Sequence, residues 1–137
     1  MLILGFLISN IVLNSCAKSS SSSPYYFKAT IGDSAFDGSS RVQYVSTIGS
    51  YDSSWGAIGG GLNGGTEMVV SALNPTGTGT YNIDTSNTFY TDTGFFQYAT
   101  SGQITISQVD SKTMTATFHF NTSHVSVTNG SFKIPKY

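Results

Sequence analysis

The side chains that could carry out acid–base or metal chemistry are few and scattered. His119 and His124 are the only histidines, and the 137 residues include seven Asp and Glu. A metal site needs several ligands close together, yet no carboxylate lies at a regular spacing from either histidine. Serine is abundant enough for a Ser–His–acid triad, but no G-x-S-x-G elbow occurs. We therefore expect exposed histidines, no metal, no cofactor and no enzyme activity.

The single cysteine, Cys16, lies between an apolar run and a serine-rich segment. Residues 1–13, MLILGFLISNIVL, carry no charge and are too few for a transmembrane helix, which needs about 20 residues. They match the hydrophobic region of a secretory signal peptide. No Lys or Arg precedes them, a departure that a start upstream of Met1 would explain. The following Leu13-Asn14-Ser15-Cys16 resembles a bacterial lipobox.

The lipobox resemblance implies that Cys16 is acylated and becomes the first residue of the mature protein. We expect a signal peptide at 1–15, a lipidated cysteine with a Ser-rich tether at 16–24, and a β domain at 25–137. The polar AKSSSSSP segment is typical of a flexible linker. Two or more acyl chains hold a protein firmly at a membrane. The expected location is the bacterial cell envelope, and Ala17 favours the outer membrane, on its periplasmic or surface-facing side.

Alternation of apolar and polar residues dominates the chain after the tether. Thr, Val, Gly and aromatic residues favour strands and turns. In TMTATFHF, the residues Met114, Ala116, Phe118 and Phe120 share one face, as expected of a half-buried antiparallel strand. Residues that favour turns recur roughly every 8–12 residues along this part of the chain. The prediction is an all-β domain: a single antiparallel β-sandwich or flattened barrel of about ten short strands, with mostly meander connections.

Three glycine-containing turns divide the predicted strands. Asn63-Gly64-Gly65 predicts a hairpin, because these residues accept positive φ. Ser101-Gly102 predicts a break between strands at 95–99 and 103–109. Asn129-Gly130 predicts a break or a bulge in the last strand.

Five segments of the mature chain resemble, in order, a group of small Bacteroidota lipoproteins classed as domains of unknown function. The segments are FKATIGDSAFDG, GTYNI, SGQITISQVD, MTATFHF and VTNGSFKIP. Ala116 stands where that family often has Gly. The resemblance implies an all-β domain on a lipid anchor, and it implies no reaction and no catalytic residue.

Three short motifs suggest binding or modification. Gly59–Gly64 fits the dinucleotide pattern G-x-G-x-x-G, but a strand follows it where a helix is needed, which favours a glycine-rich strand. Tyr51 and Trp55 could contact a ligand such as a sugar, or Trp55 could close the end of the core. Asp33-Ser34-Ala35 resembles a Bacteroidota O-glycosylation motif, which makes Ser34 a candidate for modification.

These features together predict a lipid-anchored, non-enzymatic envelope module that binds a ligand or a protein. Its partners would be the membrane, through acyl chains on Cys16, and a glycan or another envelope protein. A net charge of −1 argues against nucleic acid, which needs a basic surface. The alternatives are a lipocalin-like carrier of a small apolar ligand and a small glycan-acting hydrolase.

Overall fold

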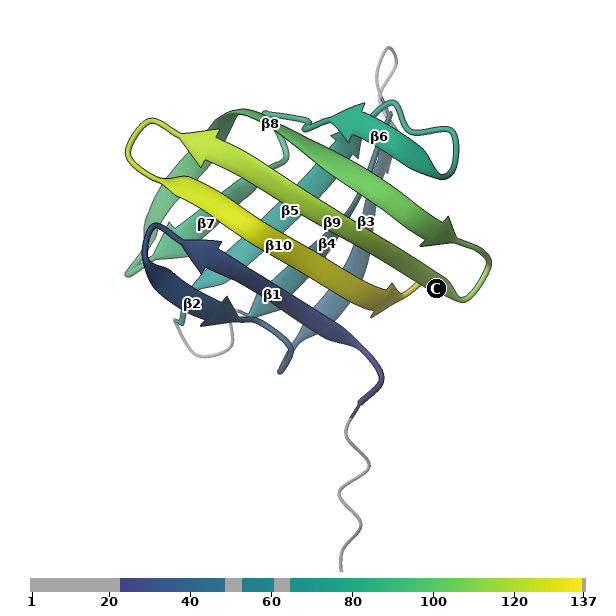
Figure 1. The fold of residues 1–137 in the computed structure, drawn as a ribbon, viewed down its shortest axis with the longest axis horizontal. Coiled ribbons are helices and arrows are strands. Elements are labelled where there is room, and N and C mark those ends of the chain that lie inside the picture. Colours follow the sequence, from purple (N-terminus) through teal and green to yellow (C-terminus); the bar gives the residue numbers. More distant parts are fainter. Residues whose placement is uncertain (1–22, 49–52, 61–64, 137) are drawn as a thin grey trace, which may run out of the picture.

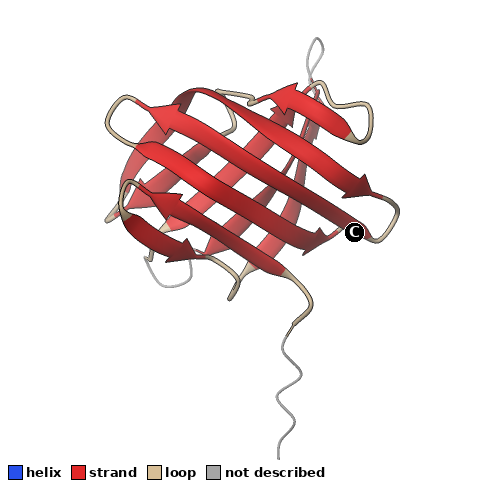
Figure 2. Cartoon of the chain, viewed as in Figure 1, coloured by secondary structure: helices blue, strands red, loops and turns tan. Residues whose placement is uncertain are grey.

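The computed structural model describes residues 23–48, 53–60 and 65–136. All regular secondary structure in this part of the chain is β-strand (Figure 2). The ten strands are β1 (Tyr26–Ile31), β2 (Ser34–Asp37), β3 (Val42–Ile48), β4 (Ser53–Gly60), β5 (Glu67–Leu73), β6 (Gly79–Asn82), β7 (Phe89–Asp92), β8 (Phe95–Val109), β9 (Thr113–Thr122) and β10 (Ser126–Pro135). Within the described ranges, no helix is long and apolar enough to cross a membrane.

The strands form one antiparallel sheet that curls into two layers (Figure 1). Their order is β2-β1-β10-β9-β8-β7-β5-β4-β3, and β6 pairs with β8 outside this path. The front layer contains β2, β1, β10, β9, β6 and the second half of β8, and the rear layer contains β3, β4, β5, β7 and the first half of β8. The predicted all-β sandwich or flattened barrel with mostly meander connections is confirmed.

Strand β8 joins the two layers, and here the prediction of two separate strands was wrong. Its 15 residues pair first with β7 and then with β6 and β9. At the expected break the register shifts between Ala99 and Ser101, so the strand bends without ending. Gly102 has a φ of +152°, and a Cβ there would overlap the carbonyl oxygen of His119. Glycine thus permits a bulge that turns the strand from one layer into the other.

Aromatic rings fill the space between the layers. Phe27 and Phe132 are 0% exposed and Phe118 is 4% exposed. The ring of Phe27 lies 5.4 Å from that of Phe118 and 5.7 Å from that of Phe132. Gly59 on β4 faces the Phe27 ring so closely that a Cβ at position 59 would overlap it. Gly59 therefore serves packing, and β5 follows as the predicted strand. Residues 61–64, which include the rest of the glycine pattern and most of the predicted Asn63-Gly64-Gly65 hairpin turn, lie outside the described residues.

The two ends of the sheet also meet at one corner. The amide of Gly38 donates to the carbonyl of Phe27 at 2.8 Å, and the amide of Gly60 donates to the carbonyls of Gly38 and Arg41 at 2.9 and 3.0 Å. These bonds connect β1 to β4 through the loop between β2 and β3. They hold the layers together on the side opposite β8.

Candidate functional site

Two of the predicted site residues, Cys16 and Tyr51, lie outside the described residues. Trp55 is partly buried and packs against the core. The Nζ of Lys136 lies 5.2 Å from its ring centroid and 5.6 Å from that of Tyr44, within the range of cation–π attraction. Trp55 thus sits between the core and the C-terminal end of β10, and its contact with a ligand stays a prediction.

Ser34 is exposed at the start of β2, directly after the turn at Gly32-Asp33. It lines a hollow of about 230 Å³, whose other lining residues include Phe36 and Asp92. An exposed hydroxyl beside a turn is accessible to a modifying enzyme, and its O-glycosylation stays a prediction.

Both histidines are exposed, as expected. His119 lies on the outward face of β9, and His124 lies in the turn before β10. The described residues contain no group of three His, Cys, Asp or Glu side chains that could hold a metal ion. The carboxylate of Asp110 serves a turn, because it accepts hydrogen bonds from the amides of Lys112 and Thr113 at 2.7 and 2.9 Å.

The most conspicuous surface feature is a cluster of exposed aromatic rings where β7 turns into β8. Phe95, Phe96 and Tyr98 are 73%, 58% and 51% exposed. Phe89, which is partly buried, completes the cluster. We call these four residues the aromatic patch. They surround a tight hairpin turn at Thr93-Gly94, where both residues have positive φ (50° and 88°).

The strand register places three of the patch residues on the outward face of the rear layer. Phe89 lies opposite Tyr98, and Thr91 lies opposite Phe96. Ring centroids are 5.2 Å apart between Phe89 and Phe96, 5.4 Å between Phe89 and Tyr98, and 6.1 Å between Phe96 and Tyr98. These separations are typical of favourable ring contacts. The rings therefore support one another in a fixed arrangement on paired strands.

The aromatic patch continues into an apolar row across the neighbouring strands. Val69 on β5 lies opposite Phe89, and Ile58 on β4 lies opposite Val69. Val69 is only 8% exposed although it belongs to the outward face. An ion pair between Arg41 and Glu67, 3.1 Å between nitrogen and oxygen, borders the row. An apolar centre with a charged border is the arrangement found in protein interfaces.

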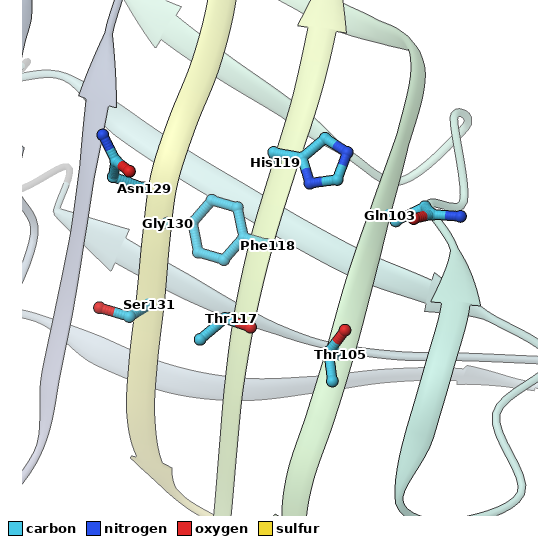
Figure 3. Close-up of a pocket in the computed structure, with 8 residues that line it drawn as sticks. All are labelled: Gln103, Thr105, Thr117, Phe118, His119, Asn129, Gly130 and Ser131. Atoms are coloured by element: carbon cyan, nitrogen blue, oxygen red, sulfur yellow. The ribbon is translucent and has the colours of Figure 1, made fainter.

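A second surface feature is a polar hollow on the outward face of the front layer (Figure 3). Its volume is about 460 Å³, within the range of ligand sites. The lining residues come from β8, β9 and β10: Gln103, Thr105, Thr117, Phe118, His119, Asn129, Gly130 and Ser131. We call this feature the polar hollow.

The bulge in β10 shapes the polar hollow. The register shifts between Val127 and Gly130, and Asn129 has a φ of 50°, so the predicted irregularity at Asn129-Gly130 is confirmed as a bulge. A Cβ at position 130 would overlap the ring of Phe118. Glycine thus leaves an opening above that ring, and the ring forms part of the lining.

Sequence patterns did not identify either surface. The run FFQY at 95–98 is a signal for the aromatic patch, because two adjacent aromatic residues on one strand cannot both face the core. The aromatic patch and the polar hollow lie on different layers, joined by β8. The resemblance to Bacteroidota lipoproteins stays a prediction, because no protein-family model, curated protein or solved structure shows a significant match to this chain.

Proposed function

We propose that this protein is a lipid-anchored, non-enzymatic module of a bacterial cell envelope that binds a partner protein through the aromatic patch. The observation that carries this proposal is the exposure of Phe96 and Tyr98 side by side on the outward face, with Phe95 exposed at the adjoining turn. Large apolar side chains that gather at a surface mark interaction sites, whereas scattered ones do not.

Burial of the aromatic patch would contribute substantially to binding. Full burial of one large apolar side chain contributes about 1.5–3 kcal/mol of favourable free energy. Aromatic residues are enriched among those that dominate interface energies. The neighbouring Arg41–Glu67 ion pair gives the border a charged element that could orient a partner.

The patch is held in place before any partner arrives. Phe89 and Tyr98 are direct partners in the pairing of β7 with β8, and their rings are in contact with that of Phe96. A preorganised surface loses less conformational entropy on binding than a mobile loop does. A protein partner with a complementary apolar surface is therefore a suitable occupant.

The anchor would determine where binding occurs. A lipidated Cys16 and the Ser-rich segment after it would hold the β domain close to the membrane while allowing it to reorient. Ser34 is exposed on β2 and shares a hollow with Asp92, the β7 residue that pairs with Phe95, so any O-linked glycan there would lie near the edge of the aromatic patch.

The carrier alternative has less support, because a carrier needs an internal cavity for its ligand. The rings of Phe27, Phe118 and Phe132 occupy the space between the layers, and Gly59 brings the backbone of β4 against one of them. The hydrolase alternative is not favoured by any contact of His119 or His124 in the described part of the chain.

Site-specific crosslinking in the cells that produce the protein tests this proposal. A photoreactive amino acid at position 96 should give a discrete adduct with an envelope protein. The matched control is position 107, because Ser107 is also exposed on β8 but lies in the front layer. Equal adducts at both positions, or none at position 96, would contradict binding through the aromatic patch.

A further inference from the structure

We infer that the polar hollow is a second binding site, and that it takes an uncharged, hydroxyl-rich ligand: a neutral oligosaccharide. This inference goes beyond the proposed protein partner, because the polar hollow lies on the front layer and the aromatic patch on the rear layer. The argument comes from the chemistry of the lining, its unused hydrogen-bonding capacity and its extended shape.

The lining consists of amides, hydroxyls, one imidazole and one aromatic ring, with no Asp, Glu, Lys or Arg. Anionic ligands are bound mainly by Arg and Lys, which form charge-assisted hydrogen bonds. Amide and hydroxyl groups both donate and accept, and so does a neutral imidazole. Sugar hydroxyls have the same dual capacity. The lining therefore matches a neutral saccharide better than an anion or an apolar ligand.

Most of this hydrogen-bonding capacity is free for a ligand. In the described part of the chain, the side chains of Gln103, Thr117, His119 and Asn129 have no hydrogen-bond partner in the protein. Thr105 differs, because its hydroxyl bonds that of Thr80 at 2.9 Å. Figure 3 shows the side chains of Gln103 and His119 on the neighbouring strands β8 and β9, where these residues are direct partners.

A neighbouring hollow extends the site. It has a volume of about 540 Å³ and shares Gln103 and His119 with the polar hollow. Its other lining residues are also uncharged: Leu73, Asn82, Ile83, Thr85, Thr100, Ser101, Gly102 and Asn121. The two hollows thus form a continuous uncharged strip that crosses the front layer and reaches the end of β5 at Leu73, with Gln103 and His119 at its centre. A strip of this kind suits several linked sugar units.

Rigid elements build the strip. Gln103 and His119 lie on strands that pair along most of their length, and the glycines at positions 102 and 130 permit close approaches that side chains would block. A ligand would therefore meet a surface whose backbone needs little rearrangement, which favours specific binding.

Binding of the detergent-solubilised full chain to immobilised glycans tests the inference. The probes are neutral α-glucan, β-glucan, mannan and xylan, with polygalacturonate and alginate as anionic probes. We expect retention on at least one neutral glycan and none on the anionic ones. The double variant Gln103→Ala/His119→Ala should weaken binding about tenfold or more, since each lost hydrogen bond lowers affinity severalfold. Both positions are exposed, so the variant should fold.

A control variant separates this site from the proposed protein site. Phe96→Ser removes a ring of the aromatic patch and should leave glycan binding unchanged, while it weakens the adduct formed by a photoreactive amino acid at the neighbouring exposed position 95. Thr117→Val, which keeps the size of the side chain, should weaken glycan binding without a change in fold. If the protein binds none of the neutral glycans or prefers the anionic probes, or if the double variant binds equally well, the inference is overturned, with no bearing on the aromatic patch.

Discussion

Phe89 and Tyr98 lie directly opposite each other on β7 and β8, with ring centroids 5.4 Å apart, while Tyr98 keeps 51% of its surface exposed. The pair shows how the sheet supports a surface cluster: the buried Tyr90, next to Phe89, points into the core from the same strand. Because side chains alternate along β7, one of its two aromatic residues packs in the core and the other lies on the surface.

Replacement of an exposed ring should change the surface more than the stability. Phe96 is 58% exposed, so Phe96→Ser should lower the free energy of unfolding by less than about 1 kcal/mol. The same change should reduce the fluorescence of a hydrophobic dye bound to the folded protein. Urea unfolding and dye titration measure the two effects.

The matched control is Phe132→Ala, which removes a ring that is 0% exposed. This variant should lower the free energy of unfolding by about 3–5 kcal/mol, because it removes apolar contacts and leaves a cavity. A similar cost for Phe96→Ser would mean that the aromatic patch serves the fold, and that the proposed interaction surface is wrong.

The contact between Gly59 and Phe27 predicts a destabilising variant. Gly59→Ala should lower the free energy of unfolding by about 1–3 kcal/mol, because the added methyl group would overlap the buried Phe27 ring and force it to move. The backbone of Gly59 does not have positive φ, so alanine is otherwise acceptable there. Denaturant unfolding of the purified variant measures the cost.

A smaller side chain at position 27 should partly relieve that overlap. The double variant Gly59→Ala/Phe27→Leu should be more stable than the sum of the two single effects indicates, as expected for residues in contact. Strict additivity would show that the cost of Gly59→Ala has another cause.

The sequence predicted the individual strands better than their junctions. Alternation in TMTATFHF placed Met114, Ala116, Phe118 and Phe120 on one buried face, and all four are found in the core. The break expected at Ser101-Gly102 is a bulge inside β8, because glycine can equally end a strand or bend it. The choice depends on the neighbouring strands β6, β7 and β9, which a local pattern does not specify.

The two candidate sites depend on the same long-range information. The run FFQY indicates that some aromatic rings must face solvent, but only the pairing of β7 with β8 brings Phe89 to Tyr98. Likewise, Gln103 and His119 are 16 residues apart by their numbers, and the register of β8 with β9 makes them neighbours. Residue type thus suggested surface chemistry, whereas register determined which groups act together.

The turn between β8 and β9 predicts an effect of pH. The backbone amide of Lys112, the side chain of Gln108 and the amide of Thr113 hold the pKa of Asp110 below its ordinary value. A carboxyl group with a lowered pKa in the folded state stabilises the fold above its unfolded pKa and loses that effect as pH falls through the folded pKa. Stability should therefore fall on acidification, at the acidic end of the carboxyl range.

Asp110→Asn should flatten this acid dependence, because an amide oxygen can still accept a hydrogen bond but does not titrate. Melting temperatures between about pH 2 and about pH 6 measure the effect. Ser111→Ala, in the same exposed turn, should keep the slope of the unmodified protein. Parallel curves for Asp110→Asn and the unmodified protein would show that the turn does not contribute to the pH dependence.

Removal of the proposed acylation site should release the protein from the membrane. The thiol of Cys16 is the only one in the chain, so Cys16→Ala removes the group that would carry the lipid. Each buried methylene contributes about 0.8 kcal/mol to membrane attachment, so the loss of two or more acyl chains should shift the protein almost completely to the soluble fraction. Ser15→Ala is the matched control, because it keeps a small residue before the cysteine and should preserve attachment. Fractionation of cells with metabolic labelling by a radioactive fatty acid measures both effects, and a Cys16→Ala protein that stays membrane-bound or labelled would contradict the anchor.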